Sequence, residues 1–403
     1  MDLTEDQQLI RESVLKLAAR FDDAYWLARD RDGEFPRDFV AAFAAGGWIG
    51  TAMPAEYGGA GLGVTEAALA MQAVAESGAG MSGASAVHIS IFGPRVIVKH
   101  GTEEQKRRFL PPLIAGKDIC SFGVTEPDAG LDTTHIKTFA ERRGDRYVIR
   151  GQKVWNSLAQ VATKILLLVR TTPLADCAVP TDGMTLFYAD FDRARIEVRE
   201  IEKMGRHCVD SNQLFIDGLD VPVEDRIGEE GKGFRYILES LNPERILIGA
   251  EAIGLGRAAL ARAARYAKER VVFGRPIGQN QAIQHPLAES WMELEAANLM
   301  MLKAAQLYDA GKPCGAEANA AKYLGAEAGF NACTRAVMTH GGYGYAKEFH
   351  VERYLREVLI ARLAPVAASS SSATSPSGFW ACRSPIERSP VGITSFPLAP
   401  IGE

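Results

Sequence analysis

The residues from Phe122 to Ser157 have the types and spacing expected of a site that holds a flat polar ring. The stretch begins with FGVTEPDAGLD, a turn-rich loop that carries a hydroxyl group. It continues through a predicted strand pair and closes on QKVWNS, which ends that pair with a tryptophan. Such a loop can present backbone hydrogen-bond donors to a polar ring. The pattern therefore predicts a cofactor site.

Three successive hydrophobic patterns must position this loop. From Leu3 to about Ala115, apolar residues recur every three or four positions, which predicts helices. Helical periodicity returns from Gly231 to about Val366, in long alanine-rich stretches typical of a helix bundle. Between them, from about Cys120 to Ile227, the pattern predicts the strands RYVIRG, KILLLVRT, MTLFYADF, IEVREI and QLFIDGLDVPV.

This order of elements predicts a multidomain α+β fold, since 403 residues exceed one compact domain and no alternating βαβ units occur. We expect an N-terminal α-helical domain (1–117), a central β-barrel-like domain (118–228) and a C-terminal four-helix bundle (229–366). The remaining tail (367–403) is rich in serine and proline without any period, which predicts irregular or disordered chain.

Composition excludes several classes of function. The net charge of −5 provides no basic surface, so nucleic acid and anionic membranes are not expected partners. The six cysteines are scattered without a CxxC pair, so a disulfide framework is not expected. The histidines have no metal-binding spacing either, so no metal site is expected. The N-terminus lacks the pattern of a signal peptide, and no stretch is expected to reach the roughly 18 apolar residues of a membrane span. A cytoplasmic protein is expected. No GxGxxG follows a strand, which argues against a Rossmann site.

Six motifs in order give the chain a family resemblance over residues 3–366. With its helix, strand and helix segments, the chain resembles the acyl-CoA dehydrogenases, flavoproteins that introduce an α,β double bond into an acyl-CoA thioester. The motifs are VTEPDAGLD at 124–132, GQKVWNS at 151–157, KMG at 203–205, GEEGKGF at 228–234, ERVVFGRPIGQNQAIQ at 269–284 and GGYGY at 341–345.

The resemblance implies that FAD is bound by two separate parts of the chain. Arg270 is similar to a family arginine that reaches the FAD pyrophosphate of a neighbouring subunit, which implies a functional homo-oligomer, a dimer or a tetramer. Glu126 is expected to anchor its own turn, and His340 to be a structural histidine. The implied cofactor-binding residues are Phe122, Val124, Thr125, Gly130, Trp155 and Ser157 in the first part, and Arg270, Phe273, Gln281, Gly341 and Gly342 in the second.

Dehydrogenation requires a base for the α-proton while the β-hydride leaves to FAD. Many family members carry a glutamate in a YEGT-like segment, where this chain has Pro365. A branch similar to isovaleryl-CoA and long-chain acyl-CoA dehydrogenases carries the base in an xxERxxxA segment, which corresponds to Glu244 here. Asn242 and Pro243 predict a helix start, which places Glu244 in a first turn. Arg245 and Asn242 match family positions near the thioester and the acyl chain.

Two features depart from the family pattern. Leu131 stands where a serine is expected to meet the pyrophosphate or the CoA moiety, and Met338 stands where a glutamine often precedes the GG pair. Each change removes a hydrogen bond worth about 0.5–1.5 kcal/mol, which weakens binding without abolishing it. The tail stands where relatives continue into a helix. We hypothesise that residues from about Ala367 onward are not native family sequence and arise from a frameshifted or truncated reading frame.

Several functions fit this scaffold. The main hypothesis is an FAD-dependent acyl-CoA dehydrogenase of fatty acid metabolism that passes electrons to an electron-transfer flavoprotein. An acyl-CoA oxidase or a flavin monooxygenase would use oxygen instead, and the presence of Glu244 favours dehydrogenation over the monooxygenase. A flavin- or CoA-binding paralogue disabled by its C-terminus is the non-enzymatic alternative.

Overall fold

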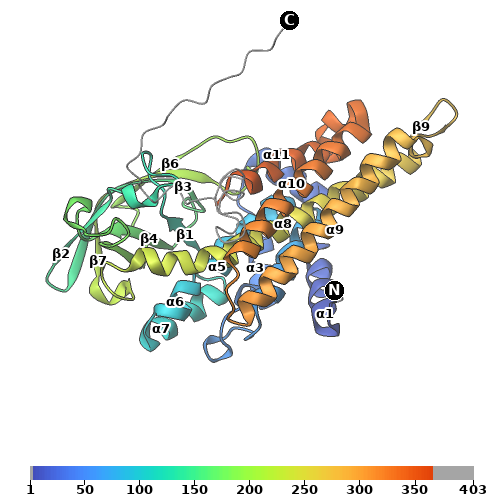
Figure 1. Ribbon diagram of the computed structural model, residues 1–403. Coiled ribbons are helices and arrows are strands. Elements are labelled where there is room, and N and C mark those ends of the chain that lie inside the picture. The colour runs from blue at the N-terminus through green and yellow to red at the C-terminus, as the bar shows by residue number, and fades with distance from the viewer. Residues whose placement is uncertain (1–2, 366–403) are drawn as a thin grey trace, which may run out of the picture.

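The computed structural model describes residues 3–365, so the expectations for the tail (367–403) lie outside the described residues. Helices form both ends of the described chain, and a β-sheet domain lies between them in the sequence and to one side in space (Figure 1). The predicted multidomain α+β fold is confirmed.

The N-terminal region is helical, as the periodicity predicted. Its first and seventh helices begin with a capping box, in which Thr4 or Thr102 binds a backbone N–H and a glutamine three residues later returns the bond. The helices are α1 (Glu5–Ala18), α2 (Asp23–Asp32), α3 (Arg37–Ala45), α4 (Val64–Val74), α5 (Gly80–Phe92), α6 (Arg95–His100) and α7 (Glu103–Ile114).

Contrary to the expectation that no stretch is long and apolar enough to span a membrane, the helical stretch Val64–His100 has that length and composition, with a mean hydropathy of 1.2. In the structure 89% of that window is buried inside the protein. This burial is typical of a core helix, because α4 and α5 pack against the long helix α8 (Gly233–Glu269).

The central strands form one mixed sheet in the order β6-β7-β3-β2-β4-β5-β8, with β1 added parallel to β4. All five predicted strands are present. Tyr147, Ile149, Leu167 and Phe187 belong to a separate core on this sheet. The strands are β1 (Cys120–Gly123), β2 (Phe139–Arg143), β3 (Arg146–Ser157), β4 (Lys164–Arg170), β5 (Met184–Asp190), β6 (Ile196–Glu200), β7 (Ser211–Pro222) and β8 (Arg226–Ile227).

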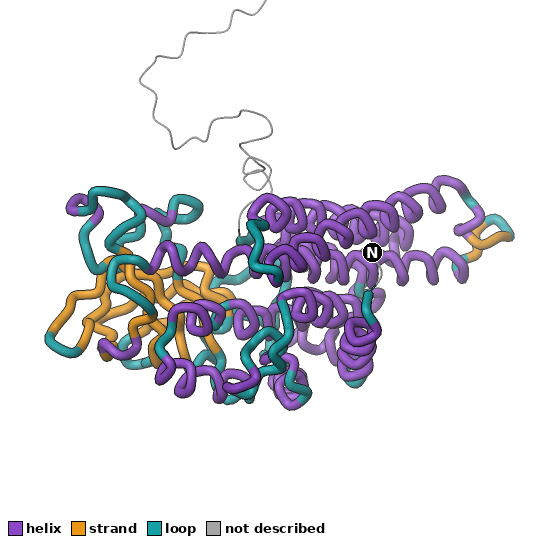
Figure 2. Tube along the Cα trace, turned by 60° about the horizontal axis from the view of Figure 1, so that its bottom comes forward, coloured by secondary structure: helices purple, strands orange, loops and turns teal. Residues whose placement is uncertain are grey.

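The C-terminal region consists of α8, α9 (Gln281–Asp309), α10 (Gly315–His340) and α11 (Val351–Leu363). Helices α8 and α10 approach closely: a Cβ added at Gly325 would lie 2.7 Å from the Gly249 carbonyl oxygen, so only glycine fits there. A small hairpin, β9 (Val271–Val272) with β10 (Arg275–Pro276), joins α8 to α9 and projects beyond the bundle at the end away from the sheet (Figures 1 and 2).

The prediction that a helix begins at Asn242 and Pro243 is wrong. Helix α8 begins at Gly233 and runs through Pro243 without ending. A proline inside a helix loses one hydrogen bond and costs about 3 kcal/mol. The turns before Pro243 nevertheless stay helical, because Ile237 is buried in the main core and Phe234 packs against it. Tertiary packing therefore overrides the local signal.

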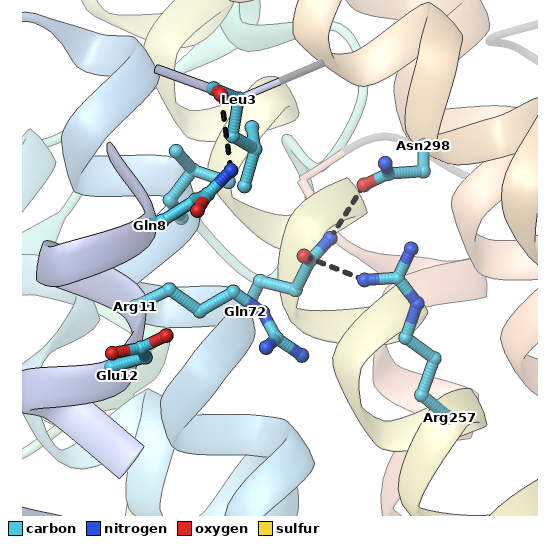
Figure 3. Close-up of a pocket in the computed structure, with 8 residues that line it drawn as sticks. Leu3, Gln8, Arg11, Glu12, Gln72, Arg257 and Asn298 are labelled. Atoms are coloured by element: carbon cyan, nitrogen blue, oxygen red, sulfur yellow. Dashed lines mark hydrogen bonds between the residues drawn. The ribbon is translucent and has the colours of Figure 1, made fainter. Parts of the chain in front are cut away.

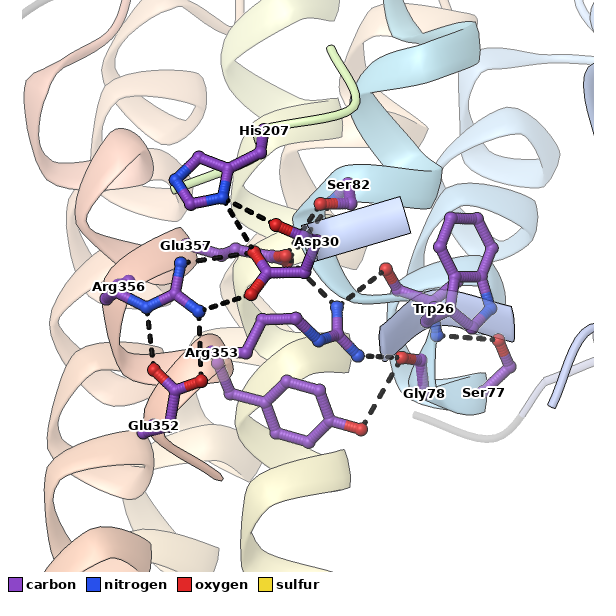
Figure 4. Close-up of polar contacts among 12 residues, drawn as sticks. Trp26, Asp30, Ser77, Gly78, Ser82, His207, Glu352, Arg353, Arg356 and Glu357 are labelled. Atoms are coloured by element: carbon purple, nitrogen blue, oxygen red, sulfur yellow. Dashed lines mark hydrogen bonds and ion pairs between the residues drawn. The ribbon is translucent and has the colours of Figure 1, made fainter. Parts of the chain in front are cut away.

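Charged side chains connect the N-terminal helices to the last helix (Figure 4). Asp30 of α2 is buried and accepts hydrogen bonds from Arg356 of α11 at 2.7 and 3.2 Å. Arg353 of α11 donates to the Gly78 carbonyl at 2.7 Å and to Glu357 at 3.0 Å. These contacts fix α11 against the helices that also pack on α8.

Polar residues also join α4, α8 and α9 beside the N-terminus. Gln72 of α4 accepts a hydrogen bond from Arg257 of α8 and donates one to Asn298 of α9, both at 2.9 Å. The three residues line a cavity of about 310 Å³ next to α1 (Figure 3). Because Gln72 bonds both Arg257 and Asn298, these residues join three helices where they pack together.

Candidate active site

The loop after β1 and the end of β3 are fixed to each other by side-chain bonds to backbone. Asn156 Nδ2 donates to the Phe122 carbonyl at 2.7 Å, and Ser121 Oγ donates to the Ser157 carbonyl at 2.8 Å. The Val154 N–H donates to the Thr125 carbonyl at 2.9 Å. The structure therefore brings Phe122, Thr125 and Ser157, all predicted flavin contacts, to one edge of the sheet.

Trp155 has an unusual backbone. Its φ of 61° lies in the left-handed region, and the β3–β7 pairing is irregular between Lys153 and Asn156. Such a conformation costs about 1–3 kcal/mol in a non-glycine residue and is concentrated at functional sites. The irregularity turns the indole outward, where it is 61% exposed. An aromatic face is thus available beside the Phe122–Thr125 backbone.

A buried ion pair supports the loop from below. Lys153 Nζ donates to Glu126 Oε1 at 2.8 Å and to the carbonyls of Val124 at 3.0 Å and Leu168 at 2.7 Å. Glu126 also accepts the N–H groups of Lys137 at 2.6 Å and Thr138 at 3.0 Å, which confirms that it anchors its turn. Burial alone would raise the pKa of Glu126, but Lys153 and these donors bring it below its usual value.

The outer part of the loop is open. Val124 is half-buried, whereas Gly130 and Leu131 are exposed, Leu131 to 68%. A Cβ added at Gly130 would meet no atom of the described chain within 4 Å, so only a bound molecule could make the close approach expected there.

Glu244 lies inside α8, twelve residues into the helix rather than in its first turn. The helix N-terminus is therefore too far away to favour its charged form. Its Oε2 atom is buried without a hydrogen-bond partner. Burial raises the pKa of Glu244 to about 7, although His88 and Arg245 lower it. A carboxyl group with this pKa is suited to accept a proton near neutral pH.

The neighbours of Glu244 include polar residues of α8 and of the adjacent helix α5. Arg245 Nη1 donates to Asn242 Oδ1 at 3.0 Å, and its Nε atom is buried without a partner. Glu251, seven residues further along α8, binds His88 Nδ1 of α5 at 2.6 Å. The His88 ring lies 4.9 Å from Phe92, which lies 5.4 Å from Phe122 of the loop. These contacts connect the Glu244 region to the predicted flavin-binding edge.

Other predicted residues gather at the far end of the bundle. Arg270, Gly341 and Gly342 line a cavity of about 590 Å³, together with Met338 and His340. The Arg270 guanidinium lies over the Tyr343 ring, 5.6 Å from its centroid. His340 Nδ1 bonds the Ala336 carbonyl at 2.8 Å and its ring stacks on Tyr266 at 4.3 Å, as expected of a structural histidine.

Phe273 and Gln281 lie near this cavity in sequence but do not line it. Phe273 is fully exposed at the tip of the β9–β10 hairpin, with a φ of 51°. Gln281 is exposed at the first position of α9. The hairpin and the sheet lie at opposite ends of the molecule (Figure 1). The structure therefore does not bring the two predicted FAD-binding parts together within one chain.

Sequence reasoning missed four residues of this region. Lys153 and Asn156 lie within a motif whose tryptophan and serine drew attention. His88 and Glu251 stand alone in apolar helix segments, AVHIS and GAEAIG, and such isolated polar residues were the available signal. In the described range 3–365, no group of three or more His, Cys, Asp or Glu side chains could hold a metal ion.

Comparisons with known proteins agree with this arrangement. Models of the acyl-CoA dehydrogenase N-terminal, middle and C-terminal domains match residues 4–117, 121–219 and 231–364. The chain is 36% identical over 377 residues to acyl-CoA dehydrogenase FadE12 of Mycobacterium tuberculosis, covering 90% of this chain and 93% of that protein. It is 37% identical to the probable acyl-CoA dehydrogenase YngJ of Bacillus subtilis, covering 88% and 93%.

A solved structure shows the same fold. Butyryl-CoA dehydrogenase from Megasphaera elsdenii superimposes with a TM-score of 0.87 at 30% identity, covering 94% of this chain and 99% of that one. The three domain models together span most of the described residues in the expected order. The chain therefore belongs to the acyl-CoA dehydrogenase family, the enzymes of which use FAD.

Proposed function

We propose that the protein introduces an α,β double bond into an acyl-CoA thioester, with Glu244 taking the α-proton. FAD, when bound, accepts the β-hydride, so the substrate is oxidised by two electrons and the flavin is reduced. The observation that carries the proposal is the Glu244 carboxyl group, which has a buried, unpartnered oxygen and a pKa of about 7. Pro365, which stands at the alternative position for the base, cannot act as one.

The residues present fit an FAD molecule in two halves. The outward indole of Trp155 and the fixed backbone from Phe122 to Thr125 offer a face and hydrogen-bonding groups to the isoalloxazine ring. The cavity beside Arg270 offers a cation that suits phosphate, and backbone at Gly341 and Gly342 that no chain atom obstructs.

Because these two halves of the site lie at opposite ends of the folded molecule (Figure 1), we infer that FAD bridges two copies in a homo-oligomer, a dimer or a tetramer. The exposed Phe273 and Gln281 would then contact the adenosine end of a neighbour's FAD. The two parts of the FAD site, which are far apart in one chain, would lie close together across two chains. This arrangement explains why the bulky Phe273 side chain is fully exposed at the hairpin tip.

The position of the proposed base on α8 bears on the family branch and on the acyl group of the substrate. A base on α8 places the protein in the branch similar to isovaleryl-CoA and long-chain acyl-CoA dehydrogenases, and favours branched or longer acyl groups. Asn242, Arg245 and Leu131 would lie along the substrate. We propose an electron-transfer flavoprotein as electron acceptor and the cytoplasm as location. The oxidase reading predicts that the reduced flavin reacts rapidly with oxygen, which stopped-flow mixing with air-saturated buffer measures.

The test is anaerobic flavin reduction by acyl-CoA, followed by the loss of the yellow flavin absorbance. Butyryl-CoA, isovaleryl-CoA and octanoyl-CoA serve as probes. Glu244→Gln should retain FAD and lose flavin reduction by about 10²- to 10⁴-fold, because removal of a general base has this effect. Glu104→Gln, an exposed acid on α7, is the matched control and should reduce at the normal rate.

Two outcomes would contradict the proposal. Wild-type reduction rates in Glu244→Gln would move the base elsewhere. A yellow wild-type protein that none of the three thioesters bleaches would favour the disabled flavin- or CoA-binding paralogue.

A further inference from the structure

A second acid on α8 lies two helical turns from the proposed base and is paired with a histidine. Glu251 Oε1 binds His88 Nδ1 at 2.6 Å, and the Glu251 side chain is completely buried while that of His88 is 11% exposed. Glu251 follows Glu244 by seven residues, which is about two helical turns, so both acids lie on one face of α8. Helix α5, which carries His88, packs against this face of α8.

The pair is not fully satisfied by the protein. Glu251 Oε2 and Glu244 Oε2 are both buried without hydrogen-bond partners, and among the described residues 3–365 no other buried carboxylate oxygen is in that condition. A buried ion pair with a purely structural role normally has its remaining lone pairs bonded. Two carboxylates on one helix face that each have an oxygen without a hydrogen-bond partner therefore indicate a role other than stabilising the fold.

Charged groups surround Glu244 on several elements. Burial opposes protonation of His88, but Glu251 and Glu244 raise its pKa above the usual value, which favours the imidazolium form. The imidazolium and Arg245 lower the pKa of Glu244, whereas Glu251 raises it. Two further cations act on the neighbours of Glu244. Arg206, which donates to Ser85 of α5 at 3.0 Å, lowers the pKa of His88, and Lys322 of α10 interacts electrostatically with Arg245.

We propose that His88, held by Glu251, is a positioning residue that keeps the Glu244 carboxylate ionised while an acyl-CoA covers it. The inference rests on the proposed function, because it assigns a task to the neighbour of the proposed base. A buried carboxylate beneath an apolar acyl chain would otherwise take up a proton from water and lose its basicity. An imidazolium fixed nearby opposes this without touching the substrate.

The first experiment compares pH profiles of anaerobic flavin reduction by the best of butyryl-CoA, isovaleryl-CoA and octanoyl-CoA. The full-length FAD-loaded protein is compared with His88→Gln, Glu251→Gln and the double variant between pH 5.5 and 9. In His88→Gln, the pH at which the rate of flavin reduction is half-maximal should rise by about one unit. Below this pH the rate should be about tenfold lower than in the wild type, whereas the rate at high pH should be unchanged.

The other variants separate charge from structure. In the double variant the shift should be smaller, because the repelling Glu251 charge is removed as well. Glu251→Gln alone should approach the double variant, since it removes the largest contribution that raises the pKa of His88 against burial. The matched control is His350→Gln: burial lowers the pKa of His350 to about 4, so this buried ring is already neutral and its replacement should leave the profile in place.

A second readout does not depend on turnover. Ring NMR of carbon-13-labelled histidine, assigned by the signal missing in His88→Gln, reports the protonation of His88. Because coupling between two titrating groups is reciprocal, Glu244→Gln should lower the pKa of His88. This measurement also carries the test if His88→Gln does not bind FAD, because His88→Gln serves only to assign the signal and the titrations use the wild type, Glu244→Gln and Glu251→Gln.

The outcomes distinguish this inference from the proposed function. If Glu244→Gln abolishes flavin reduction but the His88→Gln profile superimposes on the wild type and His88 titrates unchanged in Glu244→Gln, only the role of His88 is refuted. If Glu244→Gln reduces its flavin at the wild-type rate, the base assignment is refuted and the role of His88 with it.

Discussion

Lys153→Met probes the support of the predicted flavin-binding loop. The methionine keeps most of the side-chain volume and removes the ammonium group, which binds Glu126 Oε1 at 2.8 Å and the carbonyls of Val124 at 3.0 Å and Leu168 at 2.7 Å. The substitution leaves the Glu126 carboxylate buried with only its two backbone donors. Removal of one partner from a buried ion pair costs about 3–5 kcal/mol.

The free energy of unfolding should therefore fall by about that amount in Lys153→Met, measured by urea denaturation of the apoprotein. The FAD content of the purified protein should fall as well, because the Val124 carbonyl is no longer fixed beneath the ring-binding edge. Arg150→Met provides a matched control on the same strand, where the exposed pair with Asp217 spans 3.5 Å and should contribute at most about 1 kcal/mol.

A pH series adds an independent check. Burial lowers the pKa of Lys153 to about 8, although Glu126 raises it. A lysine whose folded pKa lies below its unfolded value binds fewer protons when folded, so it makes stability rise with pH between about 8 and 10.5. This component should be present in the wild type and absent from Lys153→Met.

A double-mutant cycle of Lys153→Met with Glu126→Gln tests whether the bond between these two side chains stabilises the protein. The two single substitutions share the bond between Nζ and Oε1, so the double variant should lose less than their sum, by about 0.5–3 kcal/mol. Strict additivity, or a Lys153→Met protein with wild-type stability and FAD content, would show that the ammonium group does not hold the loop.

Three further predictions follow from the site. Flavin reduction should rise as pH increases through about 7, because Glu244 must lose its proton to act as base, and a flat profile from pH 6 to 8 would contradict this. Arg270→Ala should weaken FAD binding about tenfold or more in equilibrium dialysis, whereas Arg275→Ala on the same hairpin should not. Arg353→Met should lower the urea midpoint, because it removes the cation that binds the buried Glu357 carboxylate at 3.0 Å and leaves that carboxylate with the two Ser82 donors.

The fold was predictable wherever one periodic signal covered a whole element. The strand KILLLVRT is observed as Lys164–Arg170, and its five central residues are all apolar because both of its faces are buried. The start of α8 was not predictable from Pro243, because the local preference of proline for a first turn competes with burial of the preceding turns. That burial is a property of the tertiary structure, which a local pattern does not contain.

The site shows the same division. The motif around Trp155 located the ring-binding edge, but the left-handed backbone that turns the indole outward depends on how β3 pairs with β7. The role of Glu126 as an anchor was predictable from its turn, whereas its partner Lys153 lies 27 residues away and becomes a neighbour only when the strands fold. Long-range partners are the part that spacing alone does not reveal.

The buried carboxylates discussed above fall into two groups, according to whether both of their oxygens have hydrogen-bond partners. Asp30, Glu126 and Glu357 have both oxygens bonded by arginine, lysine, serine or backbone donors, and these bonds fix elements to each other. Glu244 and Glu251 each retain a buried oxygen without a partner, at a cost of about 1–3 kcal/mol per group. Helix α8 has no structural need for two acids in so apolar a stretch. The cost is understandable for Glu244 if its carboxylate is the proposed proton acceptor, and for Glu251 if it holds His88 against α8.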